Sequence, residues 1–369
     1  MKIIAFYLPQ FHAFPENDQW WGKGFTEWDN VRTAQALFNG HVQPRIPLND
    51  NYYNLLDTDV IKWQSKLAKE YGIYGFCYYH YWFDGKLLME KPMEHMLADK
   101  SIDFPFCISW ANENWTRAWA QKNKEILISQ TYGGKEEWKT HFDYLLPFFK
   151  DDRYIKINEK PVMIIYRPEI IPVLRDMLVE WKKLAKENGL KDLCIIYQRA
   201  STYNHLNSED GYLFDYGIEY QPDMVHACQR KTYAMMKRKI LNAAALKIHH
   251  KLNVKNVIAY NYDETWNRIL SLKPRDEKMI PGAFVNWDNT PRHKEKGSLE
   301  LEYTVEKFKR YLSNQIVRAK TIYDKDILFL FAWNEWGEGG YLEPDAQEGY
   351  GRLEAIRDVL LETKEWRYG

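Results

Sequence analysis

Residues 327–339 read Ile-Leu-Phe-Leu-Phe-Ala-Trp-Asn-Glu-Trp-Gly-Glu-Gly, and this stretch decides both the fold and the place of the candidate site. Its first half is a continuous apolar run, which is typical of a parallel strand covered on both faces. Its second half carries Glu335 and Glu338, flanked by tryptophan and glycine. Carboxyl groups that move protons beside aromatic faces suit chemistry at a glycosidic bond. The alternative interpretation is a strand that ends in an ordinary polar turn.

Seven more apolar runs precede this one, and each is followed by a polar stretch. The eight runs are Ile3–Leu8, Tyr74–Tyr79, Phe104–Trp110, Val162–Tyr166, Leu193–Gln198, Tyr216–Tyr220, Gly282–Trp287 and Ile327–Trp333. Helical patterns between and after them are a segment capped by Asp57 or Thr58 and closed by Gly72, then Glu136–Phe149, Ile170–Asn188, Thr304–Thr321 and Gln347–Thr363. Eight strand–helix units predict an α/β fold, a single-domain (β/α)8 TIM barrel with long βα loops spanning residues 1–369. An open doubly wound sheet is disfavoured because no glycine-rich turn follows the first run.

The carboxyl ends of barrel strands form the active site in this architecture. Here nearly all of those ends carry Trp, Tyr, His, Asn or a carboxylate: Pro9–His12, His80–Trp82, Trp110–Trp115, Tyr166–Arg167, Gln198–Arg199, Glu219–Gln221, Trp287–Asn289 and Trp333–Glu338. Their convergence predicts one polar, aromatic cleft of the size of a sugar. The long loop from Pro9 to Leu56 is expected to form part of the cleft wall. Alternatively, its tryptophans only fill the mouth of the barrel.

Composition narrows the classes of function. Because 51 Lys and Arg balance 51 Asp and Glu, no overall field favours nucleic acid. Aromatic residues make up 16% of the chain, which indicates either a surface that stacks on sugars or a bulky core. The four cysteines lack metal or disulfide spacing, which predicts reduced thiols, no metal and no cofactor. With no signal peptide and no apolar run of about 18 residues, a cytoplasmic protein is expected.

One segment departs from this balance of charge. From Val225 to Asn256 the chain carries eight Lys or Arg and no Asp or Glu, within a basic helical insertion expected at about 225–280. A basic helix with an apolar side can rest on an anionic membrane or hold a lipid-linked glycan. Residues 225–256 therefore predict peripheral contact at the inner membrane face. The alternative is a solvated helix on the outside of the barrel.

Long tryptophan-rich strings carry a resemblance to a known family. They are Phe6–His12, Gly24–Trp28, Gly75–Phe83, Ser109–Thr116, Asn286–Arg292, Ala332–Glu338 and Glu343–Asp345, in order along the whole chain. On these strings the chain resembles the WbsX-type proteins of bacterial polysaccharide gene clusters, which are related to the endo-α-mannosidases of glycoside hydrolase family 99. The likeness to the hydrolases themselves is looser and rests on the barrel and on Asn334–Gly339.

The resemblance implies a retaining reaction at an α-glycoside of a bacterial surface polysaccharide or its precursor. Glu335 would be the base on the sugar 2-hydroxyl, whose oxygen attacks the anomeric carbon to give a 1,2-anhydro sugar. Glu338 would protonate the leaving oxygen and later deprotonate the acceptor. The chain departs from the family 99 motif at Gly337 and Gly340, where those hydrolases have a bulky residue and a threonine. Their mannose specificity is therefore not carried over.

The other candidate residues are expected to bind the oligo- or polysaccharide substrate, by stacking or by hydrogen bonds. They are His12, Glu27, Tyr79, His80, Tyr81, Trp82, Trp110, Asn112, Glu113, Trp115, Trp287, Asp288, Asn289, Trp333, Asn334 and Trp336. For the aromatic residues the alternative is packing at the barrel mouth. For Glu113 the alternatives are a second acid/base or a salt bridge with Arg117.

Three functions stay open on the sequence alone. The first is a hydrolase or transglycosidase that uses Glu335 and Glu338. The second is a glycosyltransferase of O-antigen or capsule biosynthesis, although no Asp-x-Asp metal-diphosphate motif is evident. The third is a non-catalytic glycan-binding barrel.

Overall fold

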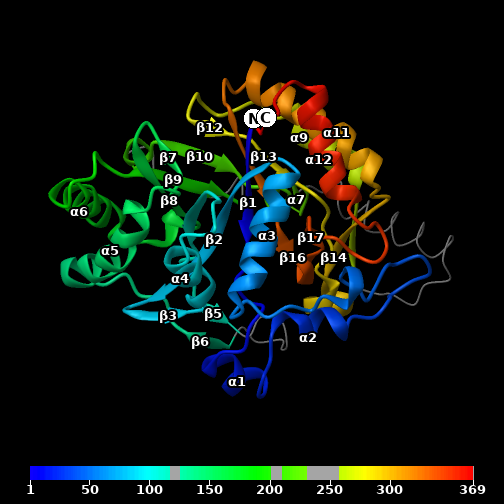
Figure 1. Ribbon diagram of the computed structural model, residues 1–369, viewed down its shortest axis with the longest axis horizontal. Coiled ribbons are helices and arrows are strands. Elements are labelled where there is room, and N and C mark those ends of the chain that lie inside the picture. Colours follow the sequence, from blue (N-terminus) through cyan, green and yellow to red (C-terminus); the bar gives the residue numbers. More distant parts are fainter. Residues whose placement is uncertain (117–124, 201–209, 231–256, 369) are drawn as a thin grey trace.

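The computed structural model describes residues 1–116, 125–200, 210–230 and 257–368. Its centre is a barrel of parallel strands surrounded by helices (Figure 1). In sheet order the strands are β12 (Met279–Ile280), β10 (Tyr216–Glu219), β9 (Cys194–Arg199), β8 (Lys160–Ile165), β4 (Phe106–Trp110), β2 (Ile73–Phe83), β1 (Lys2–Tyr7), β15 (Ile327–Phe331) and β13 (Gly282–Phe284).

The sheet closes on itself at Pro281. β12 pairs with β10 and β13 pairs with β15, and only Pro281 separates β12 from β13 along the chain. Because proline has no N–H to donate to the ladder, it divides this strand into two short segments. Counting them as one gives eight strand positions, and each of the eight apolar runs overlaps one of them. The predicted (β/α)8 barrel and its single domain are confirmed.

Amphipathic helices cover the outside of the barrel. They are α3 (Thr58–Glu70), α4 (Lys91–Ala98), α5 (Lys135–Lys150), α6 (Leu174–Glu187), α7 (Asp223–Arg230), α9 (Tyr262–Ser271), α11 (Val305–Thr321) and α12 (Gly351–Glu362). Shorter helices α1 (Pro15–Trp21), α2 (Glu27–Arg32) and α10 (Thr290–His293) lie in the loops after β1 and β13. These loops reach the mouth of the barrel.

Local sequence signals set some of the helix ends. The Asp57 side chain caps α3, as the sequence predicted, by accepting a hydrogen bond from the backbone N–H of Asp59. The helix expected to begin at Ile170 begins four residues later, at Leu174. Pro172 explains the difference, because the residue before a proline is driven out of the helical region and Ile171 is extended.

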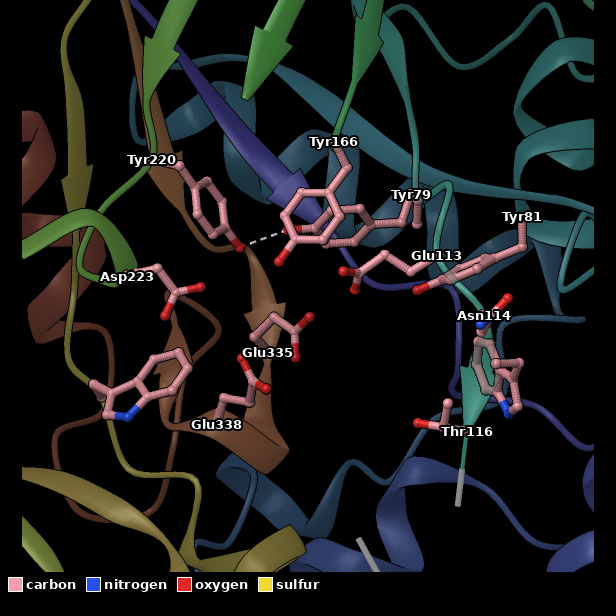
Figure 2. A pocket seen from close by; sticks show the side chains of 13 residues that line it. Tyr79, Tyr81, Glu113, Asn114, Thr116, Tyr166, Tyr220, Asp223, Glu335 and Glu338 are labelled. Atoms are coloured by element: carbon pink, nitrogen blue, oxygen red, sulfur yellow. Dashed lines mark hydrogen bonds between the residues drawn. The ribbon is translucent and has the colours of Figure 1, made fainter. Parts of the chain in front are cut away.

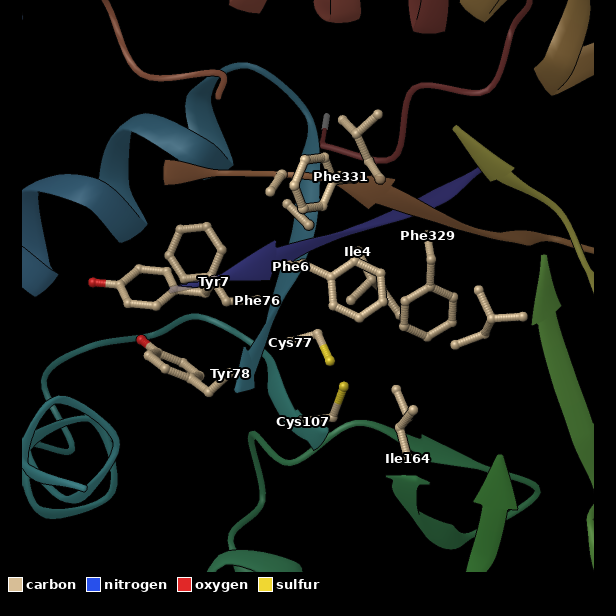
Figure 3. Close-up of a cluster of buried hydrophobic side chains, with 14 of the residues drawn as sticks. Ile4, Phe6, Tyr7, Phe76, Cys77, Tyr78, Cys107, Ile164, Phe329 and Phe331 are labelled. Carbon is tan, nitrogen blue, oxygen red and sulfur yellow. The ribbon is translucent and has the colours of Figure 1, made fainter. Parts of the chain in front are cut away.

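Side chains of the strands alternate between the barrel interior and the helix layer. Figure 3 shows Phe6, Phe329, Cys77 and Cys107 pointing toward one another inside the barrel, whereas Tyr78 lies on the other side of β2. Three cysteines, Cys77, Cys107 and Cys194, are buried free thiols, as predicted. This alternation decides which strand residues can reach the site.

Most of the basic segment 225–256 lies outside the described residues, because 231–256 are not among them. On its described flanks, α7 precedes the gap, and β11 (Ile258–Asn261) follows it and pairs in parallel with β14 (Ser298–Leu301). Contact of residues 225–256 with a membrane stays a prediction. Within the described ranges, no helix has both the length and the apolar character needed to cross a membrane.

Candidate active site

A pocket of about 270 Å³ opens at the carboxyl ends of the barrel strands (Figure 2). It is lined by Tyr79, Tyr81, Ala111, Glu113, Asn114, Trp115, Thr116, Tyr166, Tyr220, Asp223, Trp287, Glu335 and Glu338. Seven of these are residues that the sequence singled out: Tyr79, Tyr81, Glu113, Trp115, Trp287, Glu335 and Glu338. The pocket therefore combines carboxylates with aromatic faces, the two features expected of a sugar site.

Glu335 and Glu338 enter the pocket from the segment that follows β15. Glu335 ends the short strand β16 (Asn334–Glu335), and Glu338 ends the 3₁₀ turn Trp336–Glu338. Figure 2 shows the two carboxylates beside each other, with Asp223 to one side and Glu113 across the pocket. A turn, rather than a continued strand, thus directs two side chains three positions apart toward one space.

One arginine holds both glutamates. Arg292 Nη2 donates to Glu335 Oε2 at 3.0 Å, and Nη1 donates to Glu338 Oε1 at 2.6 Å. Its Nε donates to Glu27 Oε1 at 2.6 Å. Each of the three guanidinium nitrogens therefore contacts a different carboxylate. The arrangement fixes the separation and orientation of the two pocket glutamates.

The electrostatics of this cluster favour a proton on Glu335. This residue is 5% exposed, and burial raises the pKa of Glu335 to about 8 against the opposing charge of Arg292, with Glu338 and Glu27 raising it further. Burial also raises the pKa of Glu27, which Arg292 opposes. One guanidinium meets three carboxylates here, two of them buried and that of Glu338 half-buried. At neutral pH Glu335 therefore carries a proton.

Tyrosines form the floor of the pocket. Tyr79 and Tyr81 come from β2, Tyr166 follows β8, and Tyr220 follows β10. The hydroxyls of Tyr79 and Tyr220 are hydrogen-bonded at 2.8 Å. Burial raises the pKa of all four phenols, so they stay neutral and can both donate and accept hydrogen bonds.

Aromatic rings and a third carboxylate form the walls. Trp115 packs edge-on against Tyr81 with 5.2 Å between ring centroids. Trp287 is oriented by a hydrogen bond from its Nε1 to Oγ of Ser298, the first residue of β14, at 2.9 Å. Glu113 forms an ion pair with Arg167. Arg117, the partner considered from the sequence, lies outside the described residues.

His80, Trp82 and Trp110 alternate with the pocket residues and face the helix layer instead. His80 Nε2 lies 2.9 Å from Nε2 of His141 in α5, and the Trp82 ring stacks on His141 with centroids 4.4 Å apart. Trp110 packs against Trp181 in α6 at 6.0 Å. The structure therefore does not bring these three to the pocket.

Two predicted asparagines bind neighbouring backbone. Asn112 donates to the carbonyl of Arg167 and accepts from its N–H, both at 2.8 Å. Asn334 accepts from the N–H of Leu8 at 2.7 Å and donates to its carbonyl at 3.0 Å. Each asparagine joins the ends of two barrel strands and lies outside the pocket lining.

Asp288 and Asn289 order the loop that carries Arg292. Asp288 Oδ2 accepts from Gln43 at 2.7 Å and from Arg45 at 3.3 Å, and it lies 3.0 Å from His41 Nε2. These groups hold the pKa of Asp288 below its usual value, although burial acts in the opposite direction. Asn289 Oδ1 accepts the N–H of the first residue of β14 at 2.7 Å.

Three other predicted residues, His12, Trp333 and Trp336, are buried and do not line the pocket. His12 Nδ1 lies 3.0 Å from the carbonyl oxygen of the next residue. The Trp333 ring packs against Phe76 with centroids 5.0 Å apart, and Trp336 stacks on Tyr341 at 3.7 Å. Glu27 is likewise buried, and it reaches the pair only through Arg292.

Reasoning from the sequence missed several residues of the site: Ala111, Asn114, Thr116, Tyr166, Tyr220, Asp223 and Arg292. Tyr166 and Tyr220 stood in the strand ends but were not chosen. Every second residue of a barrel strand faces the interior, and counting in steps of two along β8 and β10 would have predicted that both tyrosines face the pocket. Arg292 closes the string Asn286–Arg292, yet nothing local to the sequence shows which carboxylates it meets.

Comparison with known proteins places the chain in a family. The family described as Glycosyltransferase WbsX matches residues 3–356. The chain belongs to the WbsX family. Two proteins named WxcX, from two strains of Xanthomonas campestris pv. campestris, are each 34% identical to it over 366 residues. The match covers 97% of this chain and 49% of each WxcX, so the chain spans about half the length of these curated relatives.

Solved structures share the fold of this WbsX family member. The family 99 endo-α-mannosidase from Bacteroides thetaiotaomicron aligns with a TM-score of 0.55 and 12% identity, covering 99% of this chain and 98% of that one. A glycoside hydrolase-like protein aligns with a TM-score of 0.57 and 11% identity, covering 100% and 94%. At these identities the likeness establishes the barrel fold.

Proposed function

We propose that this chain is a carbohydrate-active enzyme that acts on α-glycosidic bonds of a bacterial surface polysaccharide or its precursor. The observation that carries the proposal is the placing of Glu335 and Glu338 beside each other in a pocket lined by tyrosines and tryptophans, with Arg292 bridging them. Family membership and the fold shared with the endo-α-mannosidase support it.

In the proposed reaction the sugar supplies its own nucleophile. Ionised Glu335 takes the proton from the 2-hydroxyl, O2 forms a bond to C1, and the bond from C1 to the leaving oxygen breaks. Protonated Glu338 gives its proton to that oxygen. Glu338 then takes a proton from water or an acceptor hydroxyl, whose oxygen attacks C1. The C1–O2 bond opens, O2 regains its proton from Glu335, and two inversions retain the configuration.

This reaction needs one proton on the two glutamates. Burial raises the pKa of Glu335 to about 8, so that Glu335 holds a proton at neutral pH, whereas the reaction begins with the proton on Glu338. The two arrangements carry the same net charge, because only the position of the proton differs. Glu335 loses its proton as pH rises through about 8, and activity is expected to fall there because the proton needed by the reaction is no longer present.

The same two glutamates would catalyse glycosyl transfer if a sugar hydroxyl, rather than water, opens the anhydro intermediate. The family description as a glycosyltransferase favours this outcome. A donor activated by a nucleotide would be a separate route. A glycan-binding barrel without catalysis would bind sugars and turn none over.

Proton NMR of the anomeric region tests these possibilities. Wild type, Glu338→Gln and a control Glu187→Gln, whose side chain is 54% exposed on α6, are each mixed with α-linked oligosaccharides or nucleotide sugars. Cleavage or rearrangement with retained configuration, lost only in Glu338→Gln, is the expected result. Consumption of a nucleotide sugar only when an acceptor is present would overturn it in favour of a nucleotide-dependent transferase.

The roles of the two glutamates are separated by the leaving group. A glycosyl fluoride needs little help from an acid, so Glu338→Gln should still react with it while losing activity on an oligosaccharide. Glu335→Gln should lose activity on both, because the 2-hydroxyl is no longer deprotonated. The reverse pattern would exchange the two roles.

A further inference from the structure

The buried pair of Glu27 and Arg292 stands behind the proposed catalytic glutamates and does not itself line the pocket. Arg292 is 8% exposed and Glu27 is fully buried. Both come from loops, Glu27 from the loop after β1 and Arg292 from the loop after β13. Two segments 265 residues apart in sequence therefore meet at this ion pair.

Glu27 is held in place as firmly as the arginine it binds. It begins α2, where the Thr26 side chain caps the helix and accepts from the N–H of Trp28. The backbone N–H of Glu27 donates to the carbonyl of Gln10 at 3.1 Å, and Asn30 Nδ2 donates to Glu27 Oε2 at 3.3 Å. The carboxylate is thus a fixed anchor for the guanidinium.

The loop that presents Arg292 is tied directly to the catalytic segment. The N–H of Asp288 donates to the carbonyl of Glu338 at 2.7 Å. The Asp288 carboxylate in turn accepts from the N–H of Thr290 at 3.1 Å and from its hydroxyl at 2.6 Å, at the start of α10. Arg292 lies two residues further along, so its position is linked to that of Glu338 through backbone as well as side chain.

Gly337 provides the space in which the ion pair forms. A Cβ on Gly337 would lie 1.8 Å from Glu27 Oε1 and 2.8 Å from Arg292 Nε. Any side chain there would displace the anchor carboxylate or the arginine. The glycine between the two catalytic glutamates, where the family 99 motif has a bulky residue, is therefore matched to a buried ion pair.

We infer that Arg292, anchored by Glu27 in the space left by Gly337, is the positioning residue of the Glu335–Glu338 pair, and that its positive charge acts on both carboxylates. The inference rests on the proposed function for its meaning in catalysis. Its electrostatic part concerns the folded protein alone and can be tested without substrate.

The charges around the pair determine the direction of each effect. Titratable groups that face it are Glu27 from α2, Arg292 from α10, Tyr79 and Tyr81 from β2, and Glu113, Tyr166, Tyr220 and Asp223 around the pocket. Removing the positive charge of Arg292 makes ionisation of the pair less favourable, so its protons are lost at higher pH. Removing the negative charge of Glu27 does the opposite. A merely structural role would not give two shifts of opposite sign.

Carbon NMR of protein labelled at the glutamate carboxyl carbon measures these shifts. Glu335→Gln and Glu338→Gln assign the two resonances in the wild type. Arg292→Gln should raise the titration midpoint of the pair by about 1 pH unit or more, and Glu27→Gln should lower it by a smaller amount. Arg292→Lys should restore the midpoint partly, because lysine keeps the charge but cannot make three separate contacts.

Gly337→Ala and its control test the geometric part. The added methyl group would push the Glu27 carboxylate away, since a Cβ there would lie 1.8 Å from Glu27 Oε1, so the midpoint should fall as it does in Glu27→Gln. Gly211→Ala is the matched control, since nothing lies within 4 Å of a Cβ there. Far-ultraviolet circular dichroism shows which variants fold. If Arg292→Gln or Gly337→Ala does not fold, the midpoints of Glu27→Gln and Arg292→Lys still test the inference.

The outcomes separate this inference from the proposed function. Opposite shifts in Arg292→Gln and Glu27→Gln, with turnover reduced more than KM is changed in Arg292→Lys, would support it. Unchanged midpoints, or shifts of the same sign, would overturn it even if wild type cleaves α-glycosides. If the midpoints shift as expected but the protein turns over no glycan, the inference about Arg292 would hold and the proposed function would be rejected.

Discussion

The raised pKa of Glu335 should make the stability of the folded protein depend on pH in a way that one substitution removes. Glu335 has an ordinary value of 4.5 in the unfolded chain and about 8 in the folded protein. Because the folded state binds the proton more tightly, the stabilisation is fully present below pH 4.5 and is lost as pH rises through 8.

The size of the effect follows from the same values. Between pH 6 and 9 the contribution of Glu335 should fall by about 3 kcal/mol, since each pH unit up to 8 removes about 1.4 kcal/mol. Glu335→Gln removes this dependence, and its side-chain oxygen can still accept from Arg292. The variant should therefore gain about 3 kcal/mol relative to wild type over that interval. Glu343, whose pKa burial raises to about 7, titrates in both proteins and cancels in the comparison.

Urea unfolding of both proteins at several pH values between 6 and 9 provides the measurement. Glu187→Gln, on the exposed face of α6, should follow the wild-type curve throughout. Parallel curves for wild type and Glu335→Gln would refute the reasoning, because Glu335 would then be ionised already at pH 6. In that case Glu335 could not supply the proton that the proposed reaction places on Glu338.

Three further results are expected. Glu338→Gln should lower kcat on oligosaccharides by about 10²- to 10⁴-fold with little change in KM, measured by the release of reducing ends. Trp115→Ala should weaken glycan binding by about 10-fold in calorimetry, because a stacking face in the pocket is lost, whereas Trp110→Phe should lower the unfolding temperature and leave affinity unchanged. Tyr220→Phe removes the hydroxyl bonded to Tyr79 and should reduce affinity for the sugar, with wild-type circular dichroism as the check on folding.

The pocket residues show how far a sequence can direct attention to a site. Glu335 and Glu338 were identifiable because two carboxylates beside tryptophans at the end of a strand are rare and chemically specific. In β2, however, the string Tyr79–Trp82 alternates between pocket and helix layer. Choosing every polar or aromatic residue at a strand end therefore included His80 and Trp82, whose partner is His141 in α5.

The departures from the family 99 motif also depended on tertiary structure for their meaning. Gly337 appeared in the sequence only as a missing bulky side chain. In the folded protein its space is filled by Glu27 Oε1, which binds Arg292 Nε. Gly340 has a similar explanation, because a Cβ there would lie 2.3 Å from the ring of Phe331.

By itself the sequence determined the eight strands, their order as a parallel barrel, and the end of the barrel at which the candidate pocket lies. These follow from continuous apolar runs and strand–helix alternation, which are local and periodic properties of a chain. Only the tertiary structure decided which side chains face the pocket and which charges meet behind it. Arg292 bridges carboxylates that lie 265, 43 and 46 residues away, and no local pattern records such contacts. They exist because closing the barrel brings the loops after β1, β13 and β15 to one place.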